Sequence, residues 1–381
     1  MKKGWKITIC VLTAILLIIT ATFIFRYSLL ESLLSKEMKK RNVPGISMTL
    51  IENNSIKWSK SYGIIDNESR IPVSTETLFQ AASVTKLLVA TLALHCVEKG
   101  MIDPDKNIND YLTSWKLSDN EFTKEKKVTL RFLLSHRAGL PDTDFSYQEG
   151  HRPSLVQILN GKQPAQNKPA QVEHLPGSQW QYSNLGYVVI QLILEDVCQR
   201  PISQLMQEII FDPLQMENST LIYPLNDEFA KKDEALPHNE KGRAYPADLH
   251  PVAVAQGGLI TTPEDIAKFL IALMCAYRGE SEQIISKEMA TAMFHEEISL
   301  DPNYFGGIPA GQGLGAFIVQ GDEFYILSVG NNAPGSSCWA VCLPQSGQGA
   351  VVMTNGCQGF DLSTKIIGAI IILNHWPLPH F

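Results

Sequence analysis

The chain has 381 residues, of which 45% are hydrophobic and 19% are charged, and its formal net charge at pH 7 is −7. This length is enough for one or two domains with a large core. The acidic balance, without a basic block in the body of the chain, argues against nucleic-acid binding. The nine histidines are dispersed, and neither an H-E-x-x-H motif nor metal-like Cys or His spacing occurs, so we expect no metal or other cofactor.

The N-terminus predicts a membrane anchor. Lys2, Lys3 and Lys6 precede an uninterrupted uncharged segment that runs to Phe25, and Arg26 follows it. A helix of about 20 residues spans the apolar core of a bilayer. A cleaved signal peptide is the alternative, but the segment ends without a small-x-small cleavage pattern. We therefore expect a cytoplasmic basic tail over 1–6, a single-pass transmembrane signal-anchor over 7–26, and residues 27–381 on the periplasmic, extracytoplasmic side of the cell membrane.

Apolar periodicity and turn residues predict an α+β fold. Helices are expected over residues 28–42, 83–100, 128–135, 184–198, 202–210, 263–277 and 364–373. Strands are expected over residues 46–51, 56–62, 314–320, 324–329, 338–343 and 349–354, and an irregular surface loop over 161–179. Because strands lie at both ends of the chain, we predict an antiparallel sheet flanked by terminal helices, with an inserted mainly helical region.

The cysteines beyond Cys10, which lies in the expected anchor, predict buried and unpaired thiols. They are scattered and mostly lie in apolar stretches: Cys96, Cys198, Cys275, Cys338, Cys342 and Cys357. A disulfide from Cys338 or Cys342 to Cys357 across a hairpin is the alternative in an oxidising compartment.

Ser83-Val84-Thr85-Lys86 begins the apolar helix that ends at Gly100. Ser83 and Lys86 are one turn apart, so they share a face at the helix N-terminus. Partial desolvation lowers the pKa of a lysine, and its free lone pair can then accept the serine proton. The unpaired N–H groups of the helix N-terminus can stabilise an oxyanion. Alone, S-x-x-K also occurs by chance, and Ser83 could be a plain N-cap.

Tyr182-Ser183-Asn184 lies where the polar loop meets the next strong helix. A phenolate at Tyr182 could act as general base for Ser83, and the amide of Asn184 could bind Lys86 and a substrate carbonyl. In isolation, a half-buried aromatic residue and a helix cap would explain the same two residues.

In combination, these motifs resemble the serine beta-lactamase-related superfamily of penicillin-recognising proteins, and in particular its class C beta-lactamase, D,D-peptidase and esterase branch. Four further segments resemble that branch in the same order: LLSHRAGLP at 133–141, PGSQWQYSNLGY at 176–187, GGLITTPED at 257–265 and GQGAVVMTN at 347–355. The resemblance covers roughly Leu33 to Leu373. It implies a beta-lactamase/transpeptidase-like fold and a Ser83 acyl-enzyme, with Lys86 and Tyr182 moving the proton.

One motif departs from the branch, which carries K-T-G or H-x-G on a strand beside the nucleophile. Counted from Pro334-Gly335, the basic position falls on Val329, and no Lys or His stands nearby. By offset from the motif, the second oxyanion donor would be the N–H of Asn332. The missing positive charge puts acidic substrates such as penicillins in doubt.

The resemblance implies a membrane-anchored serine hydrolase of the cell envelope, an esterase or D,D-peptidase-like enzyme. Its substrate would be a small ester or amide, or a peptidoglycan-like peptide. A hypothesis from another class is a non-catalytic, penicillin-binding-like envelope module that binds a ligand or partner protein through the cleft. The missing basic residue motivates this second hypothesis.

Overall fold

The computed structural model describes residues 28–143, 151–222, 225–245, 253–332 and 335–379. Its main sheet is antiparallel and has eight strands in these residues, in the order β2-β1-β10-β9-β8-β7-β6-β5. The strands of the two chain ends are neighbours near one edge of this sheet, where β1 (Gly45–Glu52) pairs with β10 (Gln348–Thr354). The predicted antiparallel sheet made from both ends of the chain is therefore confirmed.

The first part of the chain supplies one end of the sheet and the start of the helical region. Residues 28–41 are helical, and β2 (Ser55–Gly63) pairs with β1. A small second sheet joins β3 (Phe79–Gln80) to β4 (Ile260–Thr261). A short 3₁₀ turn, η1 (Ala82–Val84), then leads into α2 (Thr85–Glu98).

The inserted region is mainly helical, as predicted. It contains α3 (Glu121–Glu125), α4 (Leu130–Leu134), α5 (Leu155–Leu159), α6 (Asn184–Cys198) and α7 (Ile202–Met206), which a π-helical turn over Gln207–Phe211 extends. Further along lie α8 (Pro263–Arg278) and α9 (Lys287–Met293). Residues 161–179 contain neither a regular helix nor a strand, which confirms the predicted loop.

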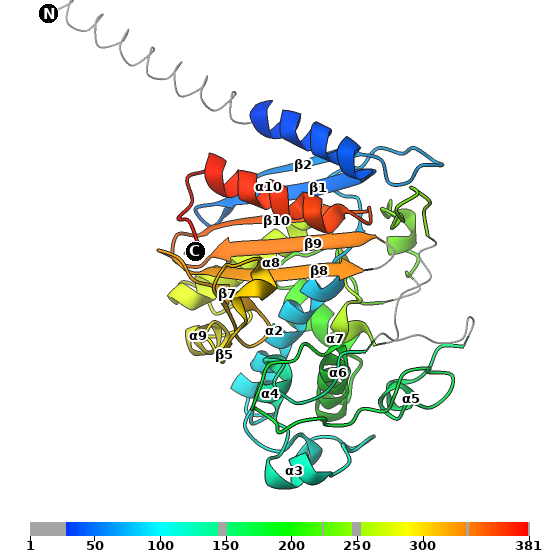
Figure 1. Cartoon of the computed structure of the whole chain (residues 1–381), viewed down its shortest axis with the longest axis vertical. Coiled ribbons are helices and arrows are strands. Elements are labelled where there is room, and N and C mark those ends of the chain that lie inside the picture. The colour runs from blue at the N-terminus through cyan, green and yellow to red at the C-terminus, as the bar shows by residue number, and fades with distance from the viewer. Residues whose placement is uncertain (1–27, 144–150, 223–224, 246–252, 333–334, 380–381) are drawn as a thin grey trace, which may run out of the picture.

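The C-terminal part returns to the sheet. Its strands are β5 (Ile298–Ser299), β6 (Ala310–Gln312), β7 (Phe317–Val319), β8 (Tyr325–Asn332), β9 (Ser336–Leu343) and β10, and α10 (Gly359–Leu373) follows. β8 extends three residues past its predicted end, and β5 and β6 were not predicted. Figure 1 shows α10 in front of the sheet, with α2, α4 and α6 gathered beyond β8.

Both faces of the sheet are covered, and the alternation of side chains along each strand assigns residues to one face or the other. Ala350 and Val352 of β10 join the apolar cluster that contains α10, whereas Val351 and Met353 join the larger cluster of the helical region. The sheet is therefore a central layer between the terminal helices on one face and the inserted region with α8 on the other.

Two sequence predictions concern features at the margins of this fold. The transmembrane prediction for residues 7–26 lies outside the described residues. Within the described part of the chain, every helix is too short or too polar to span a bilayer. The six described cysteines are free, as predicted; Cys96, Cys338 and Cys342 are buried, and the other three are partly exposed.

Candidate active site

The local backbone presents Ser83 at the start of α2. Ala82 adopts a left-handed φ of +47°, which is unfavourable for a residue with a Cβ. The hydroxyl of Thr85 donates to the Ala82 carbonyl at 2.6 Å and accepts the Leu259 N–H at 3.1 Å, so the turn is fixed from both sides. Ser83 itself stays partly exposed between the buried Ala82 and Val84. A strained turn therefore carries an accessible hydroxyl.

Strand β8 closes one side of the serine turn. A Cβ placed on Gly330 would lie 2.3 Å from the Ala81 carbonyl oxygen and 2.7 Å from the Ser83 nitrogen. Only a residue without a side chain fits such a close backbone approach. The N–H of Ser83 and the backbone of β8 thus lie beside each other, which is the arrangement that an oxyanion hole requires.

Lys86 lies directly beneath the hydroxyl of Ser83. Its Nζ donates to Ser83 Oγ at 3.0 Å, to Asn184 Oδ1 at 2.8 Å and to the Gln256 carbonyl at 2.5 Å. The residue is 3% exposed. Burial lowers the pKa of Lys86 to about 7, and the nearby carboxylate of Asp142 opposes the change. A substantial fraction of Lys86 is therefore neutral near pH 7 and can accept a proton.

Tyr182 is the second side chain that contacts the oxygen of Ser83, after Lys86. Its hydroxyl donates to Ser83 Oγ at 2.8 Å, and Lys86 Nζ lies 5.0 Å from the centre of its ring. Burial raises the pKa of Tyr182 above its ordinary value of 10, although the hydrogen bond to Ser83 acts in the opposite direction. The raised pKa favours the protonated phenol of Tyr182 over the phenolate proposed from the sequence.

The N-terminus of α6 fixes Asn184 and Tyr182. Ser183 caps the helix by accepting the Gly186 N–H at 3.0 Å, and its own N–H donates to Nδ1 of His136 at 3.1 Å. The ring of His136 lies 4.4 Å from that of Tyr182, centre to centre. Burial lowers the pKa of His136 to about 3, so the imidazole is neutral and serves as an acceptor and a packing surface.

Val329, the residue expected at the basic position of the third motif, does not face Ser83. Val329 pairs with Trp339 and packs into the cluster on the α10 face, so its side chain points away from Ser83. Ser328 and Gly330 lie on the opposite face, which meets the serine turn. On this face Gly330 meets the serine turn, and Ser328, two residues earlier in the strand, is uncharged as well. Asn332 lies two residues past Gly330, at the end of β8, and its oxyanion role stays a prediction.

Four contributions escaped sequence reasoning. Gln256 acts through a backbone carbonyl, which leaves no trace in the side-chain sequence. Asp142 lies in the loop after α4 and accepts the Asn184 N–H at 3.1 Å. His136 appears in the sequence only as one position of the LLSHRAGLP segment, and no local pattern marks Gly330. The LLSHRAGLP segment was the available signal for His136 and its neighbours, since it places a buried histidine just before the loop that carries Asp142.

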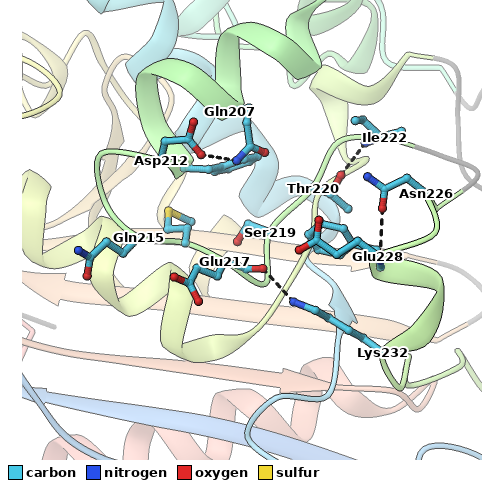
Figure 2. Close-up of a pocket in the computed structure, with 13 residues that line it drawn as sticks. Gln207, Asp212, Gln215, Glu217, Ser219, Thr220, Ile222, Asn226, Glu228 and Lys232 are labelled. Carbon is cyan, nitrogen blue, oxygen red and sulfur yellow. Dashed lines mark hydrogen bonds between the residues drawn. The ribbon is translucent and has the colours of Figure 1, made fainter.

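A separate cavity of about 650 Å³ lies between the π-helical turn η3 (Gln207–Phe211) and residues 212–222 and 226–232 (Figure 2). Several polar groups of its lining already have partners: Gln207 Nε2 donates to Asp212 at 2.5 Å, and Lys232 Nζ donates to the Glu217 carbonyl at 2.9 Å. Its lining includes none of Ser83, Lys86 and Tyr182, so it is distinct from the serine site.

Comparison with known proteins assigns the family. The Beta-lactamase family model matches residues 30–368, so the chain belongs to this family. The octameric penicillin-binding protein homologue from Pyrococcus abyssi superposes with a TM-score of 0.75 at 26% identity, over 92% of this chain and 77% of that one. A class C beta-lactamase gives a TM-score of 0.73 at 18% identity, over 91% and 96% of the two chains.

Curated relatives match a smaller part of the chain. Protein flp of Staphylococcus aureus (strain MW2) is 22% identical over 191 residues, which are 50% of this chain and 37% of that protein. The unguisins hydrolase ungD of Aspergillus violaceofuscus is 27% identical over 250 residues, 62% of this chain and 43% of that protein. The matches span less than half the length of these relatives. The beta-lactamase and penicillin-binding-protein-like fold supports a serine hydrolase type of function.

Proposed function

We propose that this protein hydrolyses an ester or amide (peptide-like) bond in the cell envelope through a covalent acyl-enzyme on Ser83. The observation that carries the proposal is that one serine oxygen contacts both a group that can accept a proton and a group that can donate one. Lys86 Nζ lies 3.0 Å from Ser83 Oγ and is partly neutral near pH 7, while the Tyr182 hydroxyl lies 2.8 Å away and is protonated. A nucleophile needs the first group and a leaving group needs the second.

The acylation step follows from these positions. Neutral Lys86 accepts the proton of Ser83 as Oγ attacks the substrate carbonyl carbon, and the carbonyl oxygen becomes an oxyanion next to the Ser83 N–H. The bond to the leaving group then breaks as Tyr182 gives it a proton. The Lys86 ammonium returns a proton to Tyr182, so both groups regain their starting states. Water repeats the sequence on the acyl-enzyme, with Lys86 as base, and releases the acid.

The uncharged third motif bears on substrate choice within this proposal. Ser328 and Gly330 lie on the face of β8 that meets the serine turn, and neither offers a positive charge to a substrate carboxylate. We therefore place esters and uncharged amides ahead of penicillins, whose carboxylate would lack a cationic partner at this position. A high rate of nitrocefin turnover would show this ranking to be wrong.

A fluorophosphonate probe tests the proposal directly, because it phosphonylates an activated serine. Wild-type protein and the control Ser55→Ala, which alters an exposed serine in the first strand turn, should label equally. Ser83→Ala should not label, and it should lose all ester turnover. Equal labelling of Ser83→Ala would remove the proposal.

The second candidate is a non-catalytic module that binds a ligand or partner at the same residues. The observation that favours it is the absence of Lys or His at both Ser328 and Val329. This hypothesis predicts that a ligand stabilises the protein against heat and that mass spectrometry of the intact protein detects no acyl adduct. Ester turnover that depends on Ser83 would exclude it.

The location in the envelope rests on the sequence of residues 1–26. We propose residues 7–26 as a single membrane span that leaves the hydrolase on the extracytoplasmic side. In bacterial cells expressing the full chain, the protein should stay in the membrane fraction after washing at alkaline pH, and external protease should reach its body. Recovery of the full chain in the soluble cytosolic fraction would contradict this location.

A further inference from the structure

A wall of aromatic rings extends from Tyr182 to the outside of the protein. Trp180 lies 6.5 Å from Tyr182, centre to centre, and Tyr304 meets Trp180 edge-on at 4.9 Å and 78°. Behind Tyr304, Phe305 lies at 4.9 Å and Phe317 at 5.8 Å. The pairs of Tyr304 with Trp180 and with Phe305 are edge-to-face, which is favourable and fixes the orientation of these rings.

This wall is anchored from behind and open in front. The indole Nε1 of Trp180 donates to Oε1 of Gln312 at 3.3 Å. Gln312 is 2% exposed, and its Nε2 donates to the carbonyls of Gly313 and Ala316. Tyr304, in contrast, is 48% exposed although it is large and mostly apolar. A rigid, partly exposed aromatic surface beside a reactive serine is typical of a binding subsite rather than of a core.

The charge beside this wall is negative. Asp142 is exposed and accepts the Asn184 N–H at 3.1 Å, which places its carboxylate next to the serine site. Ser183 Oγ also donates to the Pro141 carbonyl at 2.9 Å, which holds the Asp142 segment against the chain that carries Tyr182. Burial raises the pKa of Tyr304, and the charge of Asp142 acts in the same direction. Arg131 and Arg137, which lie on either side of His136 in the sequence, are both paired with Glu297.

The geometry points to a subsite for an ammonium-bearing leaving group, formed by the faces of Trp180 and Tyr304 and the carboxylate of Asp142. An alkylammonium ion can contact two aromatic faces and a carboxylate at once, and both kinds of contact favour positive charge. We assign the leaving group, and not the acyl group, because the wall begins at Tyr182, the residue that protonates the leaving group. This inference rests on the proposed acyl transfer at Ser83.

A pair of esters with equal shape and different charge tests the subsite. Butyrylcholine carries a quaternary ammonium, and 3,3-dimethylbutyl butyrate carries the neutral carbon isostere in the same place. We expect kcat/KM to favour the choline ester by about tenfold, which is typical of a partly exposed cation–aromatic contact with a nearby carboxylate. Asp142→Asn or Tyr304→Ala should lower this ratio toward one. Asp361→Asn, on α10 across the sheet, is the matched control and should keep it.

Two results separate failure of the subsite from failure of the hydrolase. Equal kcat/KM for the two esters, with both activities lost in Ser83→Ala, would overturn the subsite and leave the hydrolase standing. If neither ester is turned over, calorimetric titration of Ser83→Ala protein with choline and with 3,3-dimethylbutan-1-ol decides the question. Tighter binding of choline that Asp142→Asn abolishes supports the subsite, and equal or undetectable binding of the two alcohols overturns it.

Discussion

Replacing Lys86 by methionine should make the protein more stable, and by an amount that depends on pH. The side chain is 3% exposed, and burial lowers its pKa from 10.5 to about 7. Between these two values the unfolded chain binds more protons than the folded one. The free energy of unfolding of the wild type therefore rises with pH through this window, and the full destabilisation by Lys86 is present below about pH 7.

The magnitude follows from the two pKa values. One pKa unit corresponds to about 1.4 kcal/mol, so the change from 10.5 to about 7 amounts to about 5 kcal/mol at pH 6. At pH 9 most of the unfolded chain still carries a charged lysine, and about 2 kcal/mol remain. Lys86→Met also leaves Asn184 and Gln256 without a donor, but that loss hardly varies with pH. The difference in unfolding free energy between the two proteins should hence shift by about 3 kcal/mol from pH 6 to pH 9.

Urea unfolding followed by circular dichroism at pH 6, 7, 8 and 9 measures this difference. Lys99→Met is the matched control, since it makes the same substitution at the exposed C-terminal end of the same helix. The difference in unfolding free energy from wild type should stay constant with pH for Lys99→Met. For Lys86→Met it should change with pH. If the free energies of unfolding of wild type and Lys86→Met changed with pH in parallel, Lys86 would not be a buried neutral amine. Its assignment as the base would then be refuted.

Further predictions concern the catalytic groups and their supports. In the wild type, kcat/KM for an uncharged ester should rise with pH through about 7, as Lys86 loses its proton; a profile flat from pH 5.5 to 8.5 would exclude Lys86 as the base. Tyr182→Phe should slow alkyl esters by about 10²-fold or more and p-nitrophenyl esters much less, because p-nitrophenolate leaves without a proton; equal losses in stopped-flow assays would contradict its role as acid. His136→Leu removes the acceptor of a buried N–H and should lower the free energy of unfolding by about 1–3 kcal/mol in urea titrations. The wild-type contribution of this neutral imidazole should fade as pH drops from 6.5 toward 3, since its pKa is lowered by folding. Gly330→Ala should push β8 away from the serine turn and reduce fluorophosphonate labelling at least tenfold; unchanged labelling would show that β8 does not support the reaction.

Elements with a strong local pattern were predictable from the sequence. α6 has the predicted bounds, because a serine N-cap and a mostly apolar run determine it locally. The spacing of Ser83 and Lys86 likewise needed only helix geometry, and the structure brings their polar atoms to 3.0 Å. In contrast, β5 has two residues and β6 has three, and they pair only through the tertiary fold. They are too short for an apolar periodicity in the sequence to predict them.

The position of the third motif could not be predicted by counting residues along the strand. A shift of one residue moves every side chain to the other face of the sheet. Val329 was chosen by its distance from Pro334-Gly335, but its partner Trp339 and the α10 cluster place it on the far side. The protonation state of Tyr182 was out of reach for a different reason. It depends on burial by rings from several segments, among them His136 and Trp180, which only the folded chain brings together.

Lys86 also distinguishes the two candidate functions. A destabilisation of about 5 kcal/mol is large beside the 5–15 kcal/mol that typically separates folded from unfolded chains. A module that only binds a ligand gains nothing from an amine held against a serine oxygen, and an apolar side chain at this position would make it more stable. An enzyme requires that amine, because Ser83 is a weak nucleophile unless a neighbouring group accepts its proton. The burial of Nζ against Asn184, Gln256 and Ser83 thus favours the proposed acyl transfer over a function in binding alone.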